Sequence, residues 1–311
     1  MSKGFILSLV SSALLGSLII LPLWLGDFSA AEIVFGRYLV FGGLVLMIFL
    51  FRQDTAGRLK AGDHRRYLLI ALLGNLGYYL FLSIGIRELG GLAGCLLLTV
   101  LPVLSWRIFN SGWNAGRSVT TWPLLILFLA GLLLVLNNES DVANSSKEEV
   151  VFGAFWLIMA GVFWLSAARI QARLIWSNPE TDSSDYFLLS GLASLLALLL
   201  MLPLMLVGQG EFSLFSEHRN ANHWETYWLS MLYAGVAATL AARLLWRRAV
   251  LNSPGERIHG YTVLESFFGM IYLFSLEKRW PEESEWVFIV LWLFGWLLFY
   301  HCSLVSRVLK A

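Results

Sequence analysis

The chain has 311 residues, of which 58% are hydrophobic and only 14% are charged, and its mean hydropathy is +0.70. Soluble globular proteins carry about a quarter charged residues, so this composition excludes an ordinary soluble domain and indicates several membrane-spanning helices. The formal net charge is +1 and no basic run carries interleaved aromatic residues, so we expect no nucleic-acid partner.

Ten stretches of the chain meet or nearly meet the requirement for a membrane-spanning helix, which is about 20 predominantly apolar residues. They lie at about residues 4–25, 33–51, 66–86, 91–109, 121–137, 151–173, 185–207, 226–246, 257–276 and 285–306. The first stretch lacks a small-residue cleavage site, so we expect a true span and not a signal peptide. No connection is large enough to form a soluble domain. Residues 1–311 are therefore expected to form one all-α integral membrane domain with ten transmembrane helices.

The charged residues between the spans predict the orientation of the chain. Most Lys and Arg residues fall on the side of the N-terminus, and the acidic loops NNESD and PEESE fall on the other side. Positive residues favour the cytoplasmic face, and ten spans return the chain to its starting side. Both termini are therefore predicted to be cytoplasmic, in a multi-pass protein of a bacterial inner membrane.

The two halves of the chain resemble each other weakly. The third and eighth predicted spans each place small residues before a basic one: Gly74, Gly77 and Arg87 in the third, Gly235, Ala238 and Arg247 in the eighth. A repeat of five helices, an odd number, inserts the second half upside down relative to the first. We therefore expect two inverted five-helix repeats, at about residues 1–140 and 150–311, and this architecture is typical of transporters with a substrate site near the membrane midplane.

Four motifs within the predicted spans carry a resemblance to a known family. The second span opens with an Arg–aromatic pair in FGRYLVFGGLV, and the fourth has LLLTVLPVLS, a small-polar stretch that ends in Pro102 and Val103. The eighth is YAGVAATLAARLLWRRAV, with a Gly-rich start and a Trp near its end, and the ninth closes with LFSLEKRW. Together these motifs resemble the drug/metabolite transporter superfamily, in its EamA-like branch of ten-helix carriers. The family commonly ends its ninth helix in Gly-Glu, of which Glu277 remains here, and it usually has a proline near the place of Ser266, which this chain lacks.

The resemblance implies a secondary carrier that exports small organic metabolites, with amino acids, amines or related amphiphiles as its substrates. It also implies alternating access of the two halves around a midplane cavity. The partners expected are thus a small-molecule substrate and the lipid bilayer, with no cofactor. The absence of a phosphate-binding loop indicates that any uphill transport is driven by an ion gradient, of which a proton gradient is one form.

Glu265 lies near the middle of the ninth predicted span, where a carboxylate in hydrocarbon is costly and usually functional. It is predicted to bind a substrate ammonium group or to take up and release a proton, and its alternative role is a structural hydrogen bond. At helical spacing it shares a face with Thr262, and Tyr261 lies one turn below it. We expect both to line the pathway. His259 could relay protons between Glu265 and water, or simply lie solvated at the interface.

Arg37, near the outer end of the second span, has three possible roles. It could hold a substrate carboxylate or pair with Glu265. The interpretation favoured by its position is that its long side chain reaches the outer interface or braces an outer gate.

Other pathway candidates are polar or aromatic residues within the spans. In the third span, Asn75 and either Tyr78 or Tyr79 share a face and could recognise a small amphiphile, or only pack between helices. Thr99 is expected in the pathway beside a bend of the fourth helix. Trp164 either lines the cavity or faces lipid.

The chain shows no HExxH motif, no Gly-x-Ser-x-Gly motif and no paired carboxylates within one helix turn, so we expect no enzyme activity and no metal site. Cys95 and Cys302 have no metal-ligand spacing and are expected to be free thiols. Two alternatives stay open: a carrier of nucleotide sugars or lipid-linked precursors, which needs several basic residues in the cavity, and an integral membrane enzyme or lipid-handling accessory protein.

Overall fold

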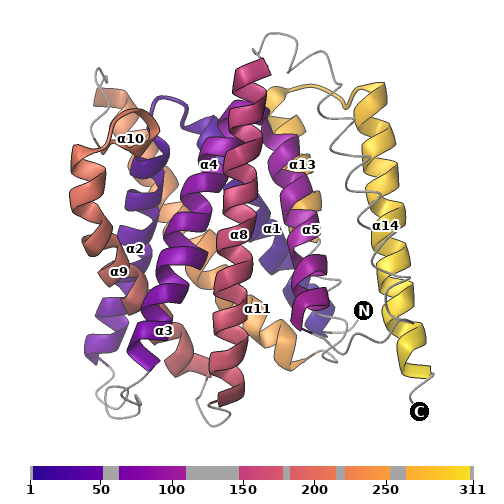
Figure 1. The fold of residues 1–311 in the computed structure, drawn as a ribbon, viewed down its shortest axis with the longest axis horizontal. Coiled ribbons are helices and arrows are strands. Elements are labelled where there is room, and N and C mark those ends of the chain that lie inside the picture. Colours follow the sequence, from indigo (N-terminus) through magenta and orange to yellow (C-terminus); the bar gives the residue numbers. More distant parts are fainter. Residues whose placement is uncertain are drawn as a thin grey trace. The chain divides into compact units, whose positions relative to one another are not determined.

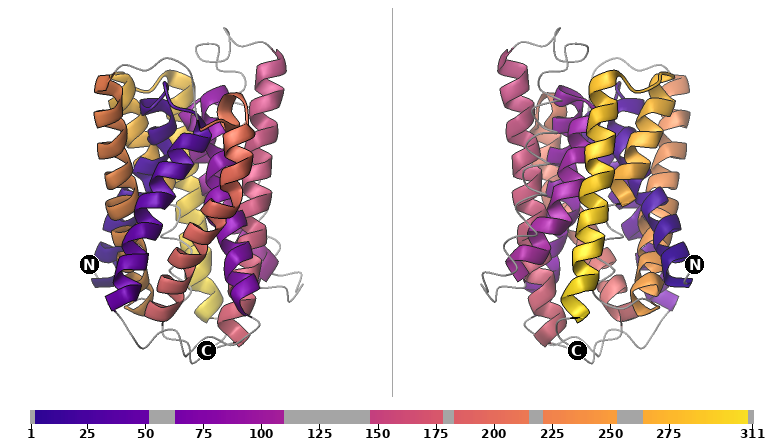
Figure 2. Two further views of the ribbon diagram at one scale, coloured as in Figure 1. Left: turned by 90° about the vertical axis from the view of Figure 1, so that its left-hand side faces the viewer. Right: turned by 90° about the vertical axis from the view of Figure 1, so that its right-hand side faces the viewer.

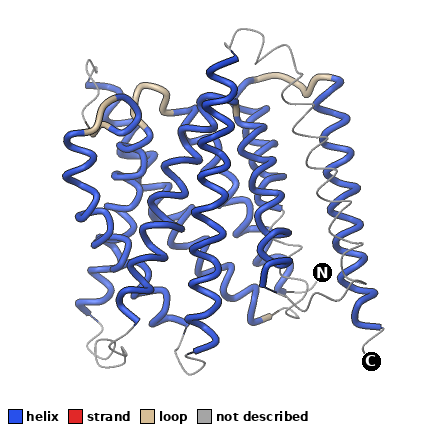
Figure 3. The backbone as a smooth tube through the Cα atoms, viewed as in Figure 1, coloured by secondary structure: helices blue, strands red, loops and turns tan. Residues whose placement is uncertain are grey.

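Every regular element that the structure describes is a helix, and no strand occurs among the described residues (Figure 3). The computed structural model describes residues 3–51, 63–109, 147–177, 183–214, 221–252 and 264–308. A helix satisfies its backbone N–H and C=O groups within one segment, as a chain in lipid must. The all-α prediction is confirmed for the described residues.

The helices follow the predicted spans closely, with ends that differ by a few residues. Their bounds are as follows: α1 (Lys3–Trp24), α2 (Ala30–Phe51), α3 (Asp63–Ile70), η2 (Ala71–Gly77), α4 (Tyr78–Leu89), α5 (Gly91–Phe109), α8 (Lys147–Ser177), α9 (Ser183–Val207), η4 (Gly210–Phe212), α10 (Ala221–Leu232), η5 (Tyr233–Ala241), α11 (Ala242–Leu251), α13 (Leu264–Glu277) and α14 (Glu283–Val308).

Six of the described segments are long and apolar enough to cross a membrane. They are Lys3–Trp24, Ala30–Phe51, Asp63–Leu89, Glu148–Leu174, Phe187–Val207 and His223–Ala249. Shorter apolar helices occupy parts of the fourth and tenth predicted spans, and α13 covers the described part of the ninth. The fifth predicted span, at about residues 121–137, lies outside the described residues. The chain is thus a multi-pass helical membrane protein, and the full set of ten spans stays a prediction.

The chain divides into two compact units. Unit 1 contains Met1–Ile20, Gly85–Phe155 and Ala242–Ala311, and unit 2 contains Leu21–Ile84 and Trp156–Ala241. Each unit combines segments from both predicted repeats. The predicted repeats are halves of the sequence related by symmetry, whereas the two units are groups of segments that pack together. The repeat boundaries therefore stay a prediction.

Unit 2 is built around α2, which packs mainly on α9 and η5, while η2 packs on α9 (Figure 1). Its large, fully buried side chains include Tyr38, Phe41, Leu76, Tyr79 and Leu198. By contrast, α9 leaves a run of leucines exposed, including Leu199, Leu200 and Leu204. Exposed leucines at this density are typical of a surface that faces lipid.

Unit 1 is held together by close contacts of α13 with α5 and with α1 (Figure 2). A Cβ atom on Gly16 of α1 would lie 2.6 Å from the carbonyl oxygen of Glu265. A Cβ atom on Gly91 of α5 would lie 2.6 Å from Leu273 Cδ1. Glycine at these two positions lets the helix backbones approach closely, as is common between helices in membranes.

The third and eighth spans both contain a π-helix, η2 and η5, at the place where the sequence has small residues. A π-helix forms i→i+5 hydrogen bonds and is wider than an α-helix. The third and eighth spans are therefore not uniform α-helices, contrary to a single helix through each. Small residues allow neighbours to approach the wide turns. A Cβ atom would lie 2.6 Å from Phe163 Cδ1 at Gly77, and 2.7 Å from Val40 Cγ1 at Gly235.

Candidate functional site

Arg37 lies in the interior of unit 2, with only 5% of its surface exposed. Its Nε–H donates a hydrogen bond to Thr239 Oγ1 at 2.9 Å. Its Cζ atom lies 4.2 Å from the centre of the Tyr79 ring and 5.0 Å from that of Tyr38. Each such cation–π contact contributes about 0.5–2 kcal/mol. The hydroxyl of Thr239 and the two rings hold its guanidinium among buried side chains, and its predicted role at the outer interface or in an outer gate stays a prediction.

The guanidinium of Arg37 has no counter-ion in the part of the chain that the structure describes. Of the five N–H donors of an arginine, its four Nη hydrogens have no acceptor among the described residues. A buried charge is costly unless it is paired and hydrogen-bonded. The arrangement therefore holds a cation in apolar surroundings with donors left to bind an anionic group.

A chain of hydrogen bonds beside Arg37 links three helical elements. The Tyr38 hydroxyl donates to the backbone carbonyl of Asn75 at 3.0 Å, and Asn75 Nδ2 donates to Ser194 Oγ at 2.7 Å. The Ser194 hydroxyl in turn donates to the carbonyl of Ser190 at 2.7 Å. Asn75 and Ser194 are both buried. This chain fixes α2 against η2 and α9 at the level of the guanidinium.

Thr239 is positioned by the π-helix that contains it. Its hydroxyl donates to the carbonyl of Ala234, five residues earlier, at 2.7 Å. Its Oγ1 atom is thereby left to accept from Arg37. Thr239 is fully buried, with 0% exposed. Thr239 is not among the residues predicted from the sequence, although a threonine within an apolar span is a signal for a buried polar contact.

The N-terminus of α2 carries two carboxylates that cap the helix. Ser29 and Glu32 form a capping box: the Ser29 N–H donates to Glu32 Oε2 at 2.7 Å, and the Glu32 N–H donates to Ser29 Oγ at 3.1 Å. The Ala30 N–H donates to Glu211 Oε2 at 2.6 Å. Tyr227 reaches the same turn and donates its hydroxyl to the Glu32 carbonyl at 2.7 Å. Negative charge at a helix N-terminus is stabilising, so Glu32 and Glu211 fix the start of the helix that carries Arg37.

A second polar cluster lies in unit 1 and contains the predicted residue Thr99. Its Oγ1 atom lies 2.9 Å from Ser266 Oγ and 3.0 Å from the Cys95 carbonyl, and it accepts a hydrogen bond from Trp292 Nε1 at 2.8 Å. Ser266 has 0% of its surface exposed. Ser266 thus joins α13 to α5 by a side-chain hydrogen bond.

Glu265 is the residue next to Ser266, in the first turn of α13. It is half-buried. Its backbone carbonyl faces Gly16 of α1, where no side chain could fit. The structure therefore places Glu265 where α1 and α13 meet closely, and its role in binding or proton transfer stays a prediction.

The remaining predicted residues are placed as follows. Asn75 and Tyr79 are buried beside Arg37, and Tyr78 is half-buried. Of the two tyrosines between which the sequence left a choice, Tyr79 is the one that contacts the guanidinium. Trp164 is half-buried on α8. The predicted residues His259, Tyr261 and Thr262 lie outside the described residues.

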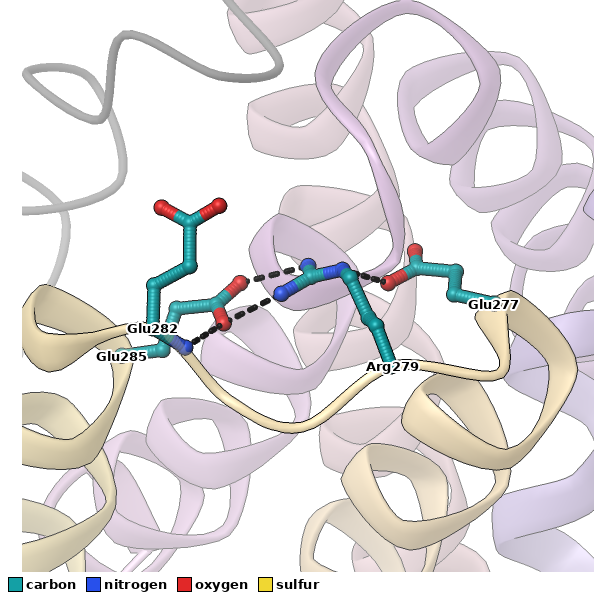
Figure 4. Close-up of polar contacts among 4 residues, drawn as sticks. All are labelled: Glu277, Arg279, Glu282 and Glu285. Carbon is teal, nitrogen blue, oxygen red and sulfur yellow. Dashed lines mark hydrogen bonds and ion pairs between the residues drawn. The ribbon is translucent and has the colours of Figure 1, made fainter.

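The loop between α13 and α14 carries an ion-pair network (Figure 4). Arg279 donates two hydrogen bonds to Glu285, at 2.6 and 2.7 Å, and a third to Glu277 Oε2 at 2.7 Å. The carboxylate of Glu285 raises the pKa of Arg279 above its usual value. Glu285 also accepts the backbone N–H of Glu282, so it caps α14. The network closes the α13–α14 hairpin and leaves no donor nitrogen of Arg279 unused.

The described residues contain no group of three or more His, Cys, Asp or Glu side chains that could hold a metal ion. Among these residues Cys95 is a buried free thiol.

Comparison with the sequence profiles of known protein families finds no match. The chain is 23% identical over 299 residues to the inner membrane protein YtfF of Escherichia coli (strain K12), an alignment that covers 90% of this chain and 89% of YtfF. A solved crystal structure, described only as that of a protein, matches over 100% of both chains with a TM-score of 0.65 and 15% sequence identity. The structural likeness at this identity shows a shared fold.

Proposed function

We propose that the chain is a secondary carrier of small organic metabolites in the bacterial inner membrane, and that it belongs to the drug/metabolite transporter superfamily. The observation that carries this proposal is the buried cation of Arg37 within a bundle of apolar helices. An ionisable group inside a membrane bundle is expensive and usually marks a substrate or ion pathway. The full-length similarity to an inner membrane protein supports the location.

The two π-helices support the proposed repeat of five helices. η2 lies in the third span and η5 in the eighth, so they occupy the same position in the two proposed halves. Both also contact elements next to Arg37: η5 supplies Thr239, and η2 supplies the carbonyl of Asn75 that binds Tyr38. Interrupted helices at matching positions of two halves are typical of carriers that work by alternating access. The orientation with both termini in the cytoplasm belongs to the same proposal.

In this mechanism Glu265 takes up and releases the coupled proton, and Asn75, Tyr78, Tyr79, Thr99 and Trp164 line the pathway. A carboxylate suits this role because it can bind and release a proton, and acidic residues within membrane spans commonly form proton relays. His259, Tyr261 and Thr262 precede Glu265 in the sequence and complete the proposed pathway on the cytoplasmic side.

The proposal is tested by comparing the metabolites of spent medium from cells with and without the protein. A metabolite that accumulates only with the protein is then measured in proteoliposomes across a pH gradient. We expect Glu265→Gln to lower transport and to remove its dependence on the gradient. Glu277→Gln is the matched control on the same helix, and we expect it to keep both. Unchanged pH-dependent transport by Glu265→Gln would remove that residue from the mechanism, and identical spent media would contradict the carrier function.

A further inference from the structure

We infer that Arg37 binds the carboxylate of the transported molecule, so that the carrier selects small organic acids, amino acids among them, over the corresponding amines. This inference rests on the carrier function proposed above and narrows its substrate class. Arg37, which would recognise the acid, has only 5% of its surface exposed and lies among apolar helices.

The side chain of Arg37 is fixed without using the donors that a carboxylate needs. Thr239 accepts from Nε, and the rings of Tyr79 and Tyr38 contact the cation. The Nη hydrogens have no acceptor among the described residues. Two parallel N–H donors of a guanidinium match the two oxygens of a carboxylate in one plane. A preorganised donor pair of this kind binds with little further loss of side-chain freedom.

The same chain shows what a saturated arginine looks like. Arg279 donates from Nη1 and Nη2 to the two carboxylate oxygens of Glu285, and from Nε to Glu277 (Figure 4). Arg37 is more deeply buried than Arg279, at 5% exposure of the residue against 28% of the Arg279 side chain, yet it has no carboxylate partner among the described residues. A purely structural arginine gains most when its charge is neutralised inside the protein. The missing partner of Arg37 is therefore assigned to the substrate.

The residues around the guanidinium of Arg37 also favour a substrate that carries a carboxylate. Tyr38 and Tyr79 are both about 1% exposed and form an aromatic wall next to the cation. The polar groups of Asn75 and Ser194 are already bonded to each other. No acidic side chain contacts Arg37 in the described part of the chain, so none there competes with an incoming anion for its Nη donors.

The test is uptake by proteoliposomes of matched pairs of labelled compounds that differ by one carboxylate. The pairs are phenylalanine with phenethylamine, leucine with 3-methylbutylamine, and lysine with cadaverine, together with benzoate. We expect the wild type to transport at least one acid better than its amine. Arg37→Gln should lower transport of that acid by about 10- to 100-fold, which is the range for hydrogen bonds to charged groups, and Arg37→Lys should restore part of it.

Two controls separate binding from folding. Arg279→Gln removes a guanidinium that is saturated within the protein, and it should leave the preference for acids unchanged. The thermal unfolding of each variant is measured in detergent, and transport is normalised to folded protein. The inference is overturned if Arg37→Gln lowers transport of an acid and of its amine equally, or if it leaves transport of the acid unchanged. A wild type that transports amines but no acids also overturns it while the carrier function stands, and a wild type that transports no compound contradicts the carrier function itself.

Discussion

Arg37 and Thr239 lie 202 residues apart in the sequence, and a hydrogen bond of 2.9 Å joins Nε of the one to Oγ1 of the other. Both residues are buried in unit 2. The bond connects the middle of α2 to the wide turns of η5, and the same Thr239 hydroxyl returns a hydrogen bond to its own helix. One small side chain thus fixes a buried cation and closes a π-helical turn.

Thr239→Val is expected to lower the free energy of unfolding by about 1–3 kcal/mol, because it leaves a buried N–H of Arg37 without its acceptor. The shape of the side chain is retained, so packing changes little. Thr239→Ser keeps the hydroxyl and should cost much less. Denaturant titration of both variants in detergent checks this. Equal stability of the valine and serine variants would show that the hydroxyl contributes nothing.

The hydrogen bond between Asn75 and Ser194 should be measurable as a coupling energy. We expect a double-mutant cycle of Asn75→Ala and Ser194→Ala to give about 0.5–1.5 kcal/mol, in line with side-chain hydrogen bonds in membrane proteins. Ser275 bonds only to the carbonyl of Ile271 in its own helix among the described contacts, so Asn75→Ala with Ser275→Ala is the matched cycle. That control should show no coupling. A coupling of zero for Asn75 and Ser194 would contradict the hydrogen bond at 2.7 Å.

Gly16→Ala is expected to destabilise the contact of α1 with α13 by about 1–3 kcal/mol, the usual cost of overpacking. The added methyl group would lie 2.6 Å from the Glu265 carbonyl oxygen and 2.9 Å from the Gly269 nitrogen, and these backbone atoms cannot move away as a side chain can. Gly43→Ala is the control, because a Cβ atom on Gly43 of α2 meets nothing within 4 Å. Alanine there should be neutral or stabilise the helix by up to about 1 kcal/mol. Thermal unfolding of both variants measures the difference in their stability. Equal stability of the two variants would show that α1 and α13 do not meet at Gly16.

Lys278→Gly is expected to stabilise the end of α13 by about 1 kcal/mol. Lys278 has a φ angle of 53°, and the Arg279 N–H donates to the Phe274 carbonyl at 3.3 Å, as in the motif that ends many helices with a left-handed residue. Glycine adopts this conformation without the cost that a Cβ atom brings. Gly90, with a φ angle of 84° at the end of α4, gives the reverse control: Gly90→Ala should destabilise. Thermal unfolding measures the stability of both variants, and a change of the same sign in the two would contradict this account.

Arg279→Gln should lower the free energy of unfolding by about 1–3 kcal/mol, because Glu285 is only 2% exposed and loses two charged donors. Glu277→Gln removes a single bond to a carboxylate that is 30% exposed, and it should cost less. An arginine is charged at pH 9 in both the folded and the unfolded state, and Glu285 raises the pKa of Arg279 in the folded state further, so the stabilising effect persists at pH 9. Unfolding at pH 7 and pH 9 measures both effects. A loss of the difference between wild type and Arg279→Gln at pH 9 would contradict the ion pair.

The sequence by itself determined the class of the protein and most of its helices. Long apolar stretches predict spanning helices because an unpaired backbone group in lipid is too costly, and this constraint is local to each stretch. Helices accordingly occupy the described parts of the predicted spans, from α1 to α14. The sequence also selected Arg37, Asn75, Tyr79 and Thr99, because polar residues are rare in such stretches.

The tertiary structure decided which of these residues meet. A periodicity of 3.6 residues could not show that Tyr79, and not Tyr78, reaches Arg37, because η2 changes the pitch of the helix just before them. The contacts of Thr239, Ser194 and Ser266 could not be predicted from sequence periodicity, since each joins two residues more than 100 positions apart. The burial of Arg37 was also beyond the reach of sequence. Position along a span measures depth in the membrane, whereas burial depends on which helices pack around that span.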